Sequence, residues 1–291
     1  MKRFFALLLG FCLLTPTLSS AQTVARPSLW HVRGPQSDVY LLGSVHILPP
    51  GVQWRSQEIE QAIARADTFV FEVPQDEKSI GRLKIMIAAK GMLPPGETLR
   101  PMLSKRAQAD FDAVLASSGL PASAVERSRP WLAGLQLLFA QIAKHNFAVE
   151  NGVDSQLAAH AIKAAKPLRY LETIEQQFAV LAPTDRKLEM EQFEAGLVDL
   201  KDIAAQVQPM VDAWAAGDQK KLDGLINGDL DRFPAARKAL LDDRNRAWLP
   251  QISAMLKEKG TFLVTVGAGH LTGPTGLPTL LREAGHKVDG P

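Results

Sequence analysis

The stretch that decides the fold is Val264-Thr265-Val266-Gly267-Ala268-Gly269-His270-Leu271, close to the C-terminal end of a 291-residue chain. An apolar, partly β-branched run, typical of a buried strand, stops at Gly267 and is followed by a second glycine and a histidine. The same plan occurs near the other end, where Val39-Tyr40-Leu41-Leu42 leads into Gly43-Ser44-Val45-His46. The sequence therefore predicts two strands that each end in a Gly-x-x-His motif.

The first motif is followed by a strand–helix–strand pattern. Residues 28–32 and 38–45 predict a hairpin, and a helix that starts at the N-cap Ser56 leads to a short strand over 68–73. The two strands that flank such a helix run parallel, adjacent or nearly so, and finish at the same edge of the sheet. Glu72, at the end of the second strand, is therefore expected to approach His46.

The middle of the chain, approximately residues 79–256, is mainly helical in pattern. Residues 166–171 are the exception, since they predict a short strand that would place Glu172 at a further strand end. The chain then returns to a core strand over 261–266 and closes with a helix and an edge strand. We expect one α/β domain over residues 22–291, with a central, mostly parallel sheet and a large helical insertion.

Residues 1–21 have the order of a secretory signal: Lys2 and Arg3, an apolar run, and small residues that end at Ala21. The apolar run is too short for a membrane anchor. We expect cleavage near Ala21 and a mature chain that is periplasmic or secreted. Since Cys12 is the only cysteine, its removal with the signal leaves no disulfide and no thiol catalysis.

The composition limits the partners of the mature chain. Hydrophobic residues make up 46% of the sequence and charged residues 22%, enough for a sizeable core. Removal of residues 1–21 leaves equal numbers of acidic and basic residues and no basic run, which argues against a nucleic-acid partner. We expect no transmembrane segment in the mature chain, and the sequence does not indicate an oligomeric state.

Ligands of open α/β sheets bind beyond the carboxyl ends of the strands. Two histidines and a carboxylate in that position, here His46, His270 and Glu72, are a common ligand set for a divalent metal with open coordination positions. Such a metal makes bound water acidic enough to act as a nucleophile. Glycine ahead of each histidine permits close backbone approach. The alternative is that each histidine is a hydrogen-bonded structural residue and Glu72 pairs with a nearby base.

Two further residues have two readings each. Arg244 could point into the cleft and stabilise an oxyanion or clamp a carboxylate, or it could be a surface residue paired with a neighbouring aspartate. Glu172 could orient a ligand histidine or contact substrate, or it could be an acid favoured by a helix N-terminus. Asp154 is expected to cap the helix that follows it. Ser44 is not part of a Gly-x-Ser-x-Gly motif, which makes serine catalysis a poor alternative.

Several motifs occur in a characteristic order. They are Leu42-Gly43-Ser44-Val45-His46, Val70-Phe71-Glu72-Val73, Leu171-Glu172-Thr173-Ile174-Glu175-Gln176-Gln177, Asp243-Arg244-Asn245 and Val266-Gly267-Ala268-Gly269-His270-Leu271. Over nearly the whole mature chain, this set resembles the TraB/GumN (TraB/PrgY) family. That family is similar to the Tiki metalloproteases and, more distantly, to the erythromycin-esterase (EreA) and ChaN-like folds.

The resemblance implies roles for individual residues. His46 and His270 would be metal ligands, and Glu72 would be either a third ligand or the general base. Arg244 would belong to the catalytic site, while Glu172 and Asn245 would contact substrate or support a ligand. One departure from the Tiki pattern is that we find no C-terminal membrane anchor.

The sequence thus leads to two hypotheses. The first is an exported, metal-dependent hydrolase, a Tiki-like peptidase that uses Mn, Co, Zn or Fe and acts on a peptide or a small envelope substrate. The second is a non-catalytic envelope protein that binds a metal, haem or a polysaccharide component on the same scaffold.

Overall fold

The computed structural model describes residues 25–182 and 185–291, and the predicted export signal over residues 1–21 lies outside them. Its centre is a six-stranded sheet with the order β4-β3-β5-β2-β1-β6. The strands are β1 (Leu29–Arg33), β2 (Ser37–Ser44), β3 (Thr68–Phe71), β4 (Leu168–Tyr170), β5 (Gly260–Gly267) and β6 (Val288–Asp289).

Four of these strands are parallel. β4, β3, β5 and β2 run in one direction, while β1 is antiparallel to both of its neighbours, β2 and β6. The predicted α/β class, mostly parallel sheet and N-terminal hairpin are therefore confirmed. β5 lies between β2 and β3, so the two strands of the predicted strand–helix–strand unit are nearly adjacent rather than adjacent. This central place explains the continuous apolar run of β5, since its residues 262–267 are all buried.

Helices make up most of the described chain between β3 and β5, and one helix precedes β3 and another follows β5. They are α1 (Gln57–Arg65), α2 (Glu77–Lys90), α3 (Lys105–Ser118), α4 (Ala122–Val125), α5 (Pro130–Lys144), α6 (Val153–Lys163), α7 (Ile174–Leu181), α8 (Arg186–Leu200), α9 (Ile203–Ala216), α10 (Gln219–Leu230), α11 (Pro234–Arg237), α12 (Asp243–Met255) and α13 (Leu277–Glu283). Short 3-10 turns η1 (Arg100–Met102), η2 (Val149–Asn151) and η4 (Ala268–Leu271) and a π turn η3 (Lys238–Asp242) complete the described elements.

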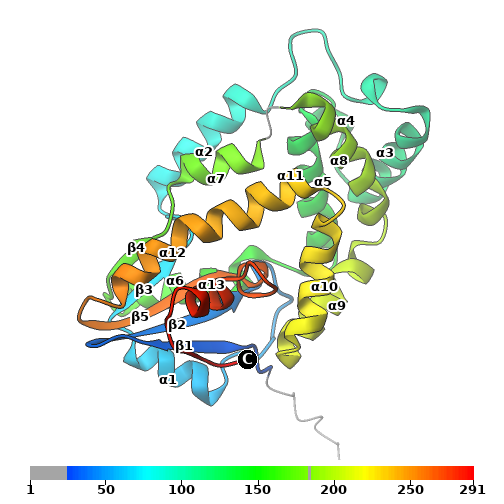
Figure 1. The fold of residues 1–291 in the computed structure, drawn as a ribbon. Coiled ribbons are helices and arrows are strands. Elements are labelled where there is room, and N and C mark those ends of the chain that lie inside the picture. The colour runs from blue at the N-terminus through cyan, green and yellow to red at the C-terminus, as the bar shows by residue number, and fades with distance from the viewer. Residues whose placement is uncertain (1–24, 183–184) are drawn as a thin grey trace, which may run out of the picture.

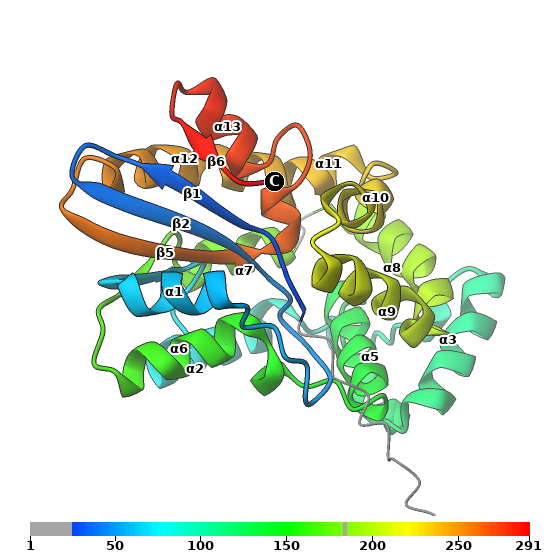
Figure 2. The same ribbon diagram turned by 90° about the horizontal axis from the view of Figure 1, so that it is seen from below.

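The sheet is covered on both faces (Figures 1 and 2). Alternate residues of β2 point to opposite sides, so that Leu42 joins the apolar cluster with α1 and α6, and Leu41 joins the cluster with α12 and α13. Figure 2 shows the two pairs of helices on opposite sides of the strands. The helices α3, α5, α8, α9 and α10 gather to one side of the sheet as a separate helical layer (Figure 1). No helix in the described ranges is long and apolar enough to cross a membrane.

The π turn η3 determines how α12 presents its first residues. The N–H of Asp243 bonds to the carbonyl of Lys238, five residues earlier, instead of the usual four. One extra residue in the turn rotates the side chains that follow by about 100° relative to a continuous α-helix. Arg244 is the second residue after this turn, and the change of direction aims its side chain at the ends of the strands.

Candidate functional site

The carboxyl ends of four strands meet at one edge of the sheet. Ser44, the last residue of β2, pairs with Gly267 of β5, and Phe71 of β3 pairs with Thr265 of β5 and Tyr170 of β4. The predicted site residues follow these ends within three positions. The structure therefore brings together His46, Glu72, Glu172 and His270.

Arg244 lies at the centre of this group, and its side chain is only 12% exposed. Its Nη2 donates to Oε2 of Glu72 at 2.5 Å and also to Glu172, while its Nε donates to the second Glu172 oxygen at 3.2 Å. The guanidinium also lies over the ring of Trp248, 4.7 Å from the centroid. Arg244 is thus a buried residue of the cleft, held by two carboxylates from separate strand ends.

The two carboxylates have different environments. Burial acts to raise the pKa of Glu72, but the basic groups His270 and Arg244 and the N–H of Gly267, 2.7 Å from Oε1, lower it overall. Burial raises the pKa of Glu172, and the ion pair with Arg244 offsets this only in part. The site therefore pairs one ionised carboxylate with one that holds a proton more readily.

His270 is fixed from both sides of its ring. Nδ1 lies 2.7 Å from Oδ1 of Asn245 and donates to it, so Nε2 is the bare nitrogen and accepts from Nη1 of Arg244 at 3.0 Å. The side-chain amide of Asn245 also donates to the carbonyls of His270 and Thr275. Burial lowers the pKa of His270 to about 3, and the charge of Arg244 adds to this effect. The ring is therefore neutral at physiological pH.

His46 has a corresponding arrangement. Its Nδ1 lies 3.1 Å from Oδ1 of Asp154, an oxygen that also accepts from the hydroxyl of Ser44 at 2.5 Å. Gln75 donates to the other oxygen of Asp154 at 3.2 Å. The side chain of His46 is 55% exposed at the mouth of the cleft, so solvent screens its neighbours in part. Partial loss of hydration acts to lower its pKa, and the hydrogen bond and charge of Asp154, helped by Glu72, raise it to about 9.

Asp154 is the residue that the sequence pattern misassigned. We expected a helix cap, but Gly152 is the N-cap of α6, and the side chain of Asp154 is buried against His46 instead. A Cβ at Gly152 would lie 2.2 Å from the carbonyl oxygen of His46, so this glycine lets the start of α6 approach the motif closely. No local signal in the sequence links residues that lie 108 positions apart.

Gly267 lies at the centre of the site, next to both histidines and Glu72. A Cβ built on this residue would lie 3.1 Å from Nε2 of His46, 3.3 Å from Oε1 of Glu72 and 3.6 Å from Cδ2 of His270. A Cβ on Gly43 would likewise lie 3.2 Å from the backbone of Ala268. The glycines that open the two motifs therefore have the predicted role of allowing close approach.

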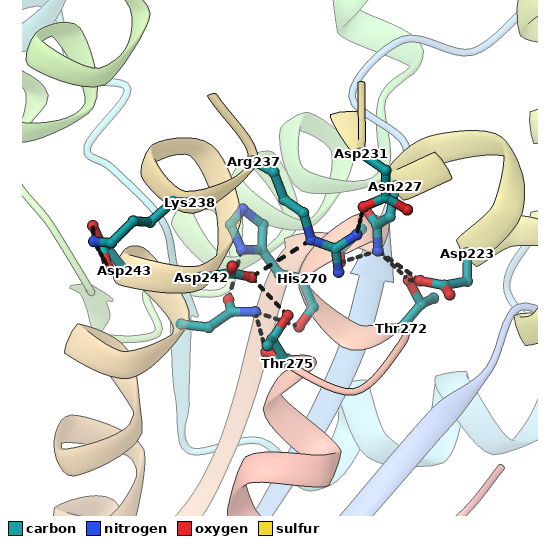
Figure 3. A network of polar contacts seen from close by, with 12 residues as sticks. Asp223, Asn227, Asp231, Arg237, Lys238, Asp242, Asp243, His270, Thr272 and Thr275 are labelled. Carbon is teal, nitrogen blue, oxygen red and sulfur yellow. Dashed lines mark hydrogen bonds and ion pairs between the residues drawn. The ribbon is translucent and has the colours of Figure 1, made fainter. Parts of the chain in front are cut away.

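A polar network holds the loop that carries His270 (Figure 3). From α10, Asn227 donates to the carbonyl of Gly269 at 3.3 Å and to the hydroxyl of Thr272 at 2.9 Å. From η3, Asp242 accepts from Thr275 at 2.7 Å. The loop is thereby tied to two separate helices, which limits the movement of the histidine.

His46, Glu72, Asp154, Arg244 and His270 line a cleft of about 410 Å³, whereas Glu172 lines a separate pocket. Polar groups come from the strand ends, and apolar side chains of Phe139, Val149, Val180 and Leu181 form the opposite wall. A concave site with few, converging polar groups is the usual form of a small-molecule or catalytic site.

The cleft does not hold its candidate ligands in a metal-binding arrangement. Among the residues that the structure describes, no group of three or more His, Cys, Asp and Glu side chains is placed to hold a metal ion. The reason is visible in the contacts of Arg244, since its guanidinium takes lone pairs of Glu72 and His270 that a metal would need.

Comparison with known proteins gives relatives without an assigned activity. The chain is 25% identical over 257 residues to the uncharacterised protein YbaP of Escherichia coli (strain K12), an alignment that covers 84% of this chain and 87% of YbaP. It is 21% identical over 296 residues to an uncharacterised protein of Treponema pallidum (strain Nichols), covering 93% of this chain and 88% of that protein. No solved structure gives a significant match. Residues 28–290 match the TraB/PrgY/gumN family, and the chain belongs to it.

Proposed function

We propose that the protein is an exported, metal-dependent hydrolase that cleaves peptide bonds in the cleft at the strand ends. The observation that carries this proposal is the matched pair of histidines. Each has its Nδ1 occupied, by Asp154 in one case and Asn245 in the other, which leaves Nε2 as the nitrogen for a ligand once Arg244 releases that of His270. Metal-ligating histidines are typically held in this way through their other ring nitrogen.

The donor set fits a divalent ion in its chemistry. His46, His270 and Glu72 would hold the ion once His46 has released its proton, since two neutral imidazoles and one ionised carboxylate suit Zn, Mn, Co or Fe. When bound, such an ion would make a water molecule acidic enough to attack a carbonyl and would polarise that carbonyl. Binding requires Arg244 to give up its contacts with Glu72 and His270 while Glu172 retains it.

The remaining groups of the cleft suit the other needs of peptide hydrolysis. Once released from Glu72, Arg244 can donate to the oxyanion that forms on the carbonyl oxygen. Glu72 would serve as a ligand or would take the proton of the attacking water and, as the base, pass it to the leaving amine. Glu172 would hold Arg244 in place through its ion pair. Asp154 keeps the ring of His46 in one orientation.

The proposal is tested by incubating a mixture of peptides with the purified protein and added Mn, Co or Zn, and by detecting new termini by mass spectrometry. We expect cleavage that is lost with a chelator and in His46→Ala. The matched control is His145→Ala, because His145 is exposed at the end of α5 and outside the cleft. Cleavage that persists in His46→Ala, or no cleavage with any metal, would contradict the proposal.

Arg244→Ala separates this function from that of a binding protein. A hydrolase should keep its metal in this variant but lose turnover, because the oxyanion loses its donor. A protein that only binds a metal, haem or a polysaccharide component should show a graded loss of affinity across the substitutions of the cleft, with no turnover in the parent.

A further inference from the structure

A second, larger cavity adjoins the candidate cleft. It encloses about 620 Å³ between α5, α7, α8, α11 and η3, within the range of cavities that bind small molecules. Val180, Leu181 and Leu240 line both the cavity and the cleft. The carbonyl of Leu240 also accepts from Nη1 of Arg244 at 3.1 Å, so one helical turn joins the cavity to the central residue of the site. The cavity and the cleft therefore share part of one wall, and together they are called the groove.

Small residues keep this cavity open. Gly196 of α8 lies on its wall, and a Cβ built there would meet no atom within 4 Å. Gly134 of α5 lies on the opposite helix, where a Cβ would be 3.5 Å from the ring of Phe193. Ala236 and Ala239 complete the narrow part of the wall. Larger side chains at these positions would fill the space.

The wall is mostly apolar, and its carboxylate and amide side chains are Asp185, Glu189, Gln192 and Asp199. Glu189 is buried, and its oxygens are taken by Nη2 of Arg129 at 2.6 Å and the backbone N–H of Trp131 at 3.2 Å. Most of the lining consists of apolar side chains, and away from the helix ends the backbone N–H and C=O groups of the wall bond within the helices. A peptide backbone placed here would leave its own amides without partners, which costs free energy, whereas an alkyl chain has no such groups.

The mouth of the groove is also apolar. Phe139 is 47% exposed and Val149 is 46% exposed, although both are large hydrophobic residues, and Leu181 is 39% exposed beside them. All three line the cleft that holds Arg244. Clustered exposed apolar side chains around a polar site mark a surface that contacts an apolar ligand.

We propose that the cavity binds the alkyl chain of an acylated substrate, whose amide then lies in the cleft beside Arg244 and His46. The identity of the cleaved bond rests on the proposed function, but binding of the chain does not. Leu240 and Val180 lie at the junction, where the apolar chain would give way to the polar amide.

Binding can be measured with dansylaminoundecanoic acid, whose fluorescence rises in an apolar cavity. We expect saturable binding to the purified protein, with displacement by dodecanoate and much weaker displacement by hexanoate. Gly196→Leu should weaken binding by about tenfold or more, because the added side chain occupies the cavity. Its fold should be retained, since leucine replaces glycine within a helix. Gly224→Leu is the matched control, as Gly224 is an exposed glycine in α10 whose Cβ would also meet no atom.

Four results would overturn the proposal. The first is absence of probe binding by the parent, and the second is equal binding by Gly196→Leu and the parent. The third is displacement of the probe by an apolar heptapeptide but not by dodecanoate, which would assign the cavity to a peptide. A change of oligomeric state in Gly196→Leu without a change in probe affinity would assign the groove to a second copy of the chain, and would equally contradict it.

Turnover separates this proposal from the hydrolase itself. With p-nitroanilide amides of acetic and decanoic acid, we expect a higher kcat/KM for the decanoyl amide in the parent and loss of that preference in Gly196→Leu. Probe binding that is intact in the parent and in His46→Ala, with no turnover of any amide, would support the alkyl site while contradicting the hydrolase. Turnover without a preference for the longer acyl chain would support the hydrolase while contradicting the alkyl site.

Discussion

Nη2 of Arg244 lies 2.5 Å from Oε2 of Glu72, and this contact joins the first turn of α12 to the end of β3 across 172 residues of chain. The same guanidinium is bound by Glu172 at the end of β4. Without Arg244, two carboxylates would face each other in a mostly buried site. The arginine is therefore both the electrostatic support of this edge and the group that must move for a metal to bind.

Replacement of Arg244 by alanine should destabilise the metal-free protein by about 3–5 kcal/mol at neutral pH, because partly buried carboxylates are left unpaired. The loss should shrink as pH falls and these carboxylates take up protons. Urea unfolding at several pH values measures both effects. Arg246→Ala is the control, since the Arg246 side chain is 57% exposed on the same helix and its contact with Asp243 is 3.9 Å long. Equal stability of the two variants would show that the contacts of Arg244 with Glu72 and Glu172 contribute nothing to the free energy of unfolding.

The pair formed by His46 and Asp154 should make stability depend on pH. In the metal-free protein, Asp154 raises the pKa of His46 to about 9, whereas that of an unfolded histidine is about 6.5. The pair therefore stabilises the fold fully below about pH 6.5, and its contribution is lost as pH rises through about 9. The difference in unfolding free energy between the parent and Asp154→Asn should be largest near pH 6 and decline above about pH 8.

Nuclear magnetic resonance of the imidazole ring checks the cause directly. The pKa of His46 should fall in Asp154→Asn, because the negative charge that favours the protonated ring is removed. A pKa that does not change with the substitution would rule out Asp154 as the source of the shift.

Gly267→Ala should disable the site without unfolding the chain. The backbone of Gly267 has φ −50° and ψ 136°, which alanine adopts freely, so we expect a stability change of about 1 kcal/mol or less. The new methyl group would crowd His46 and Glu72, and metal affinity should fall by about tenfold or more. Calorimetric metal titration and thermal unfolding measure the two quantities.

Gly81→Ala serves as the comparison for that variant. A Cβ at Gly81 meets no atom within 4 Å, and alanine is the better helix former within α2. It should gain about 0.5–1 kcal/mol of stability and keep its metal affinity. Unchanged metal affinity in Gly267→Ala would mean that His46, Glu72 and His270 do not hold a metal ion next to this glycine.

The strand ends could be predicted from the sequence because their signals are local. The apolar run that stops at Gly267 and the hairpin before His46 are patterns within a few residues, and both are present as expected. Parallel pairing then follows from general rules of chain connection, which is enough to bring Glu72 and His270 to one edge.

What could not be predicted depends on contacts between distant residues. The pattern around Asp154 is equally consistent with a helix cap, and only the approach of α6 to the first motif gives it His46 as a partner. The periodicity of the helix that contains Arg244 does not reveal a π turn, because one inserted residue changes the apolar spacing very little. The cavity beside Leu240 depends on how five elements pack, and the residues that form it read individually as ordinary small or apolar helix positions.

Metal analysis of the purified protein beside His46→Ala and His270→Ala, after incubation with Mn, Co or Zn and removal of excess ion, tests the central claim most directly. We predict close to one bound ion per chain in the parent and loss of that ion in both variants, with all three proteins folded. The same metal content in all three proteins, or none in the parent, would contradict a shared site at these strand ends.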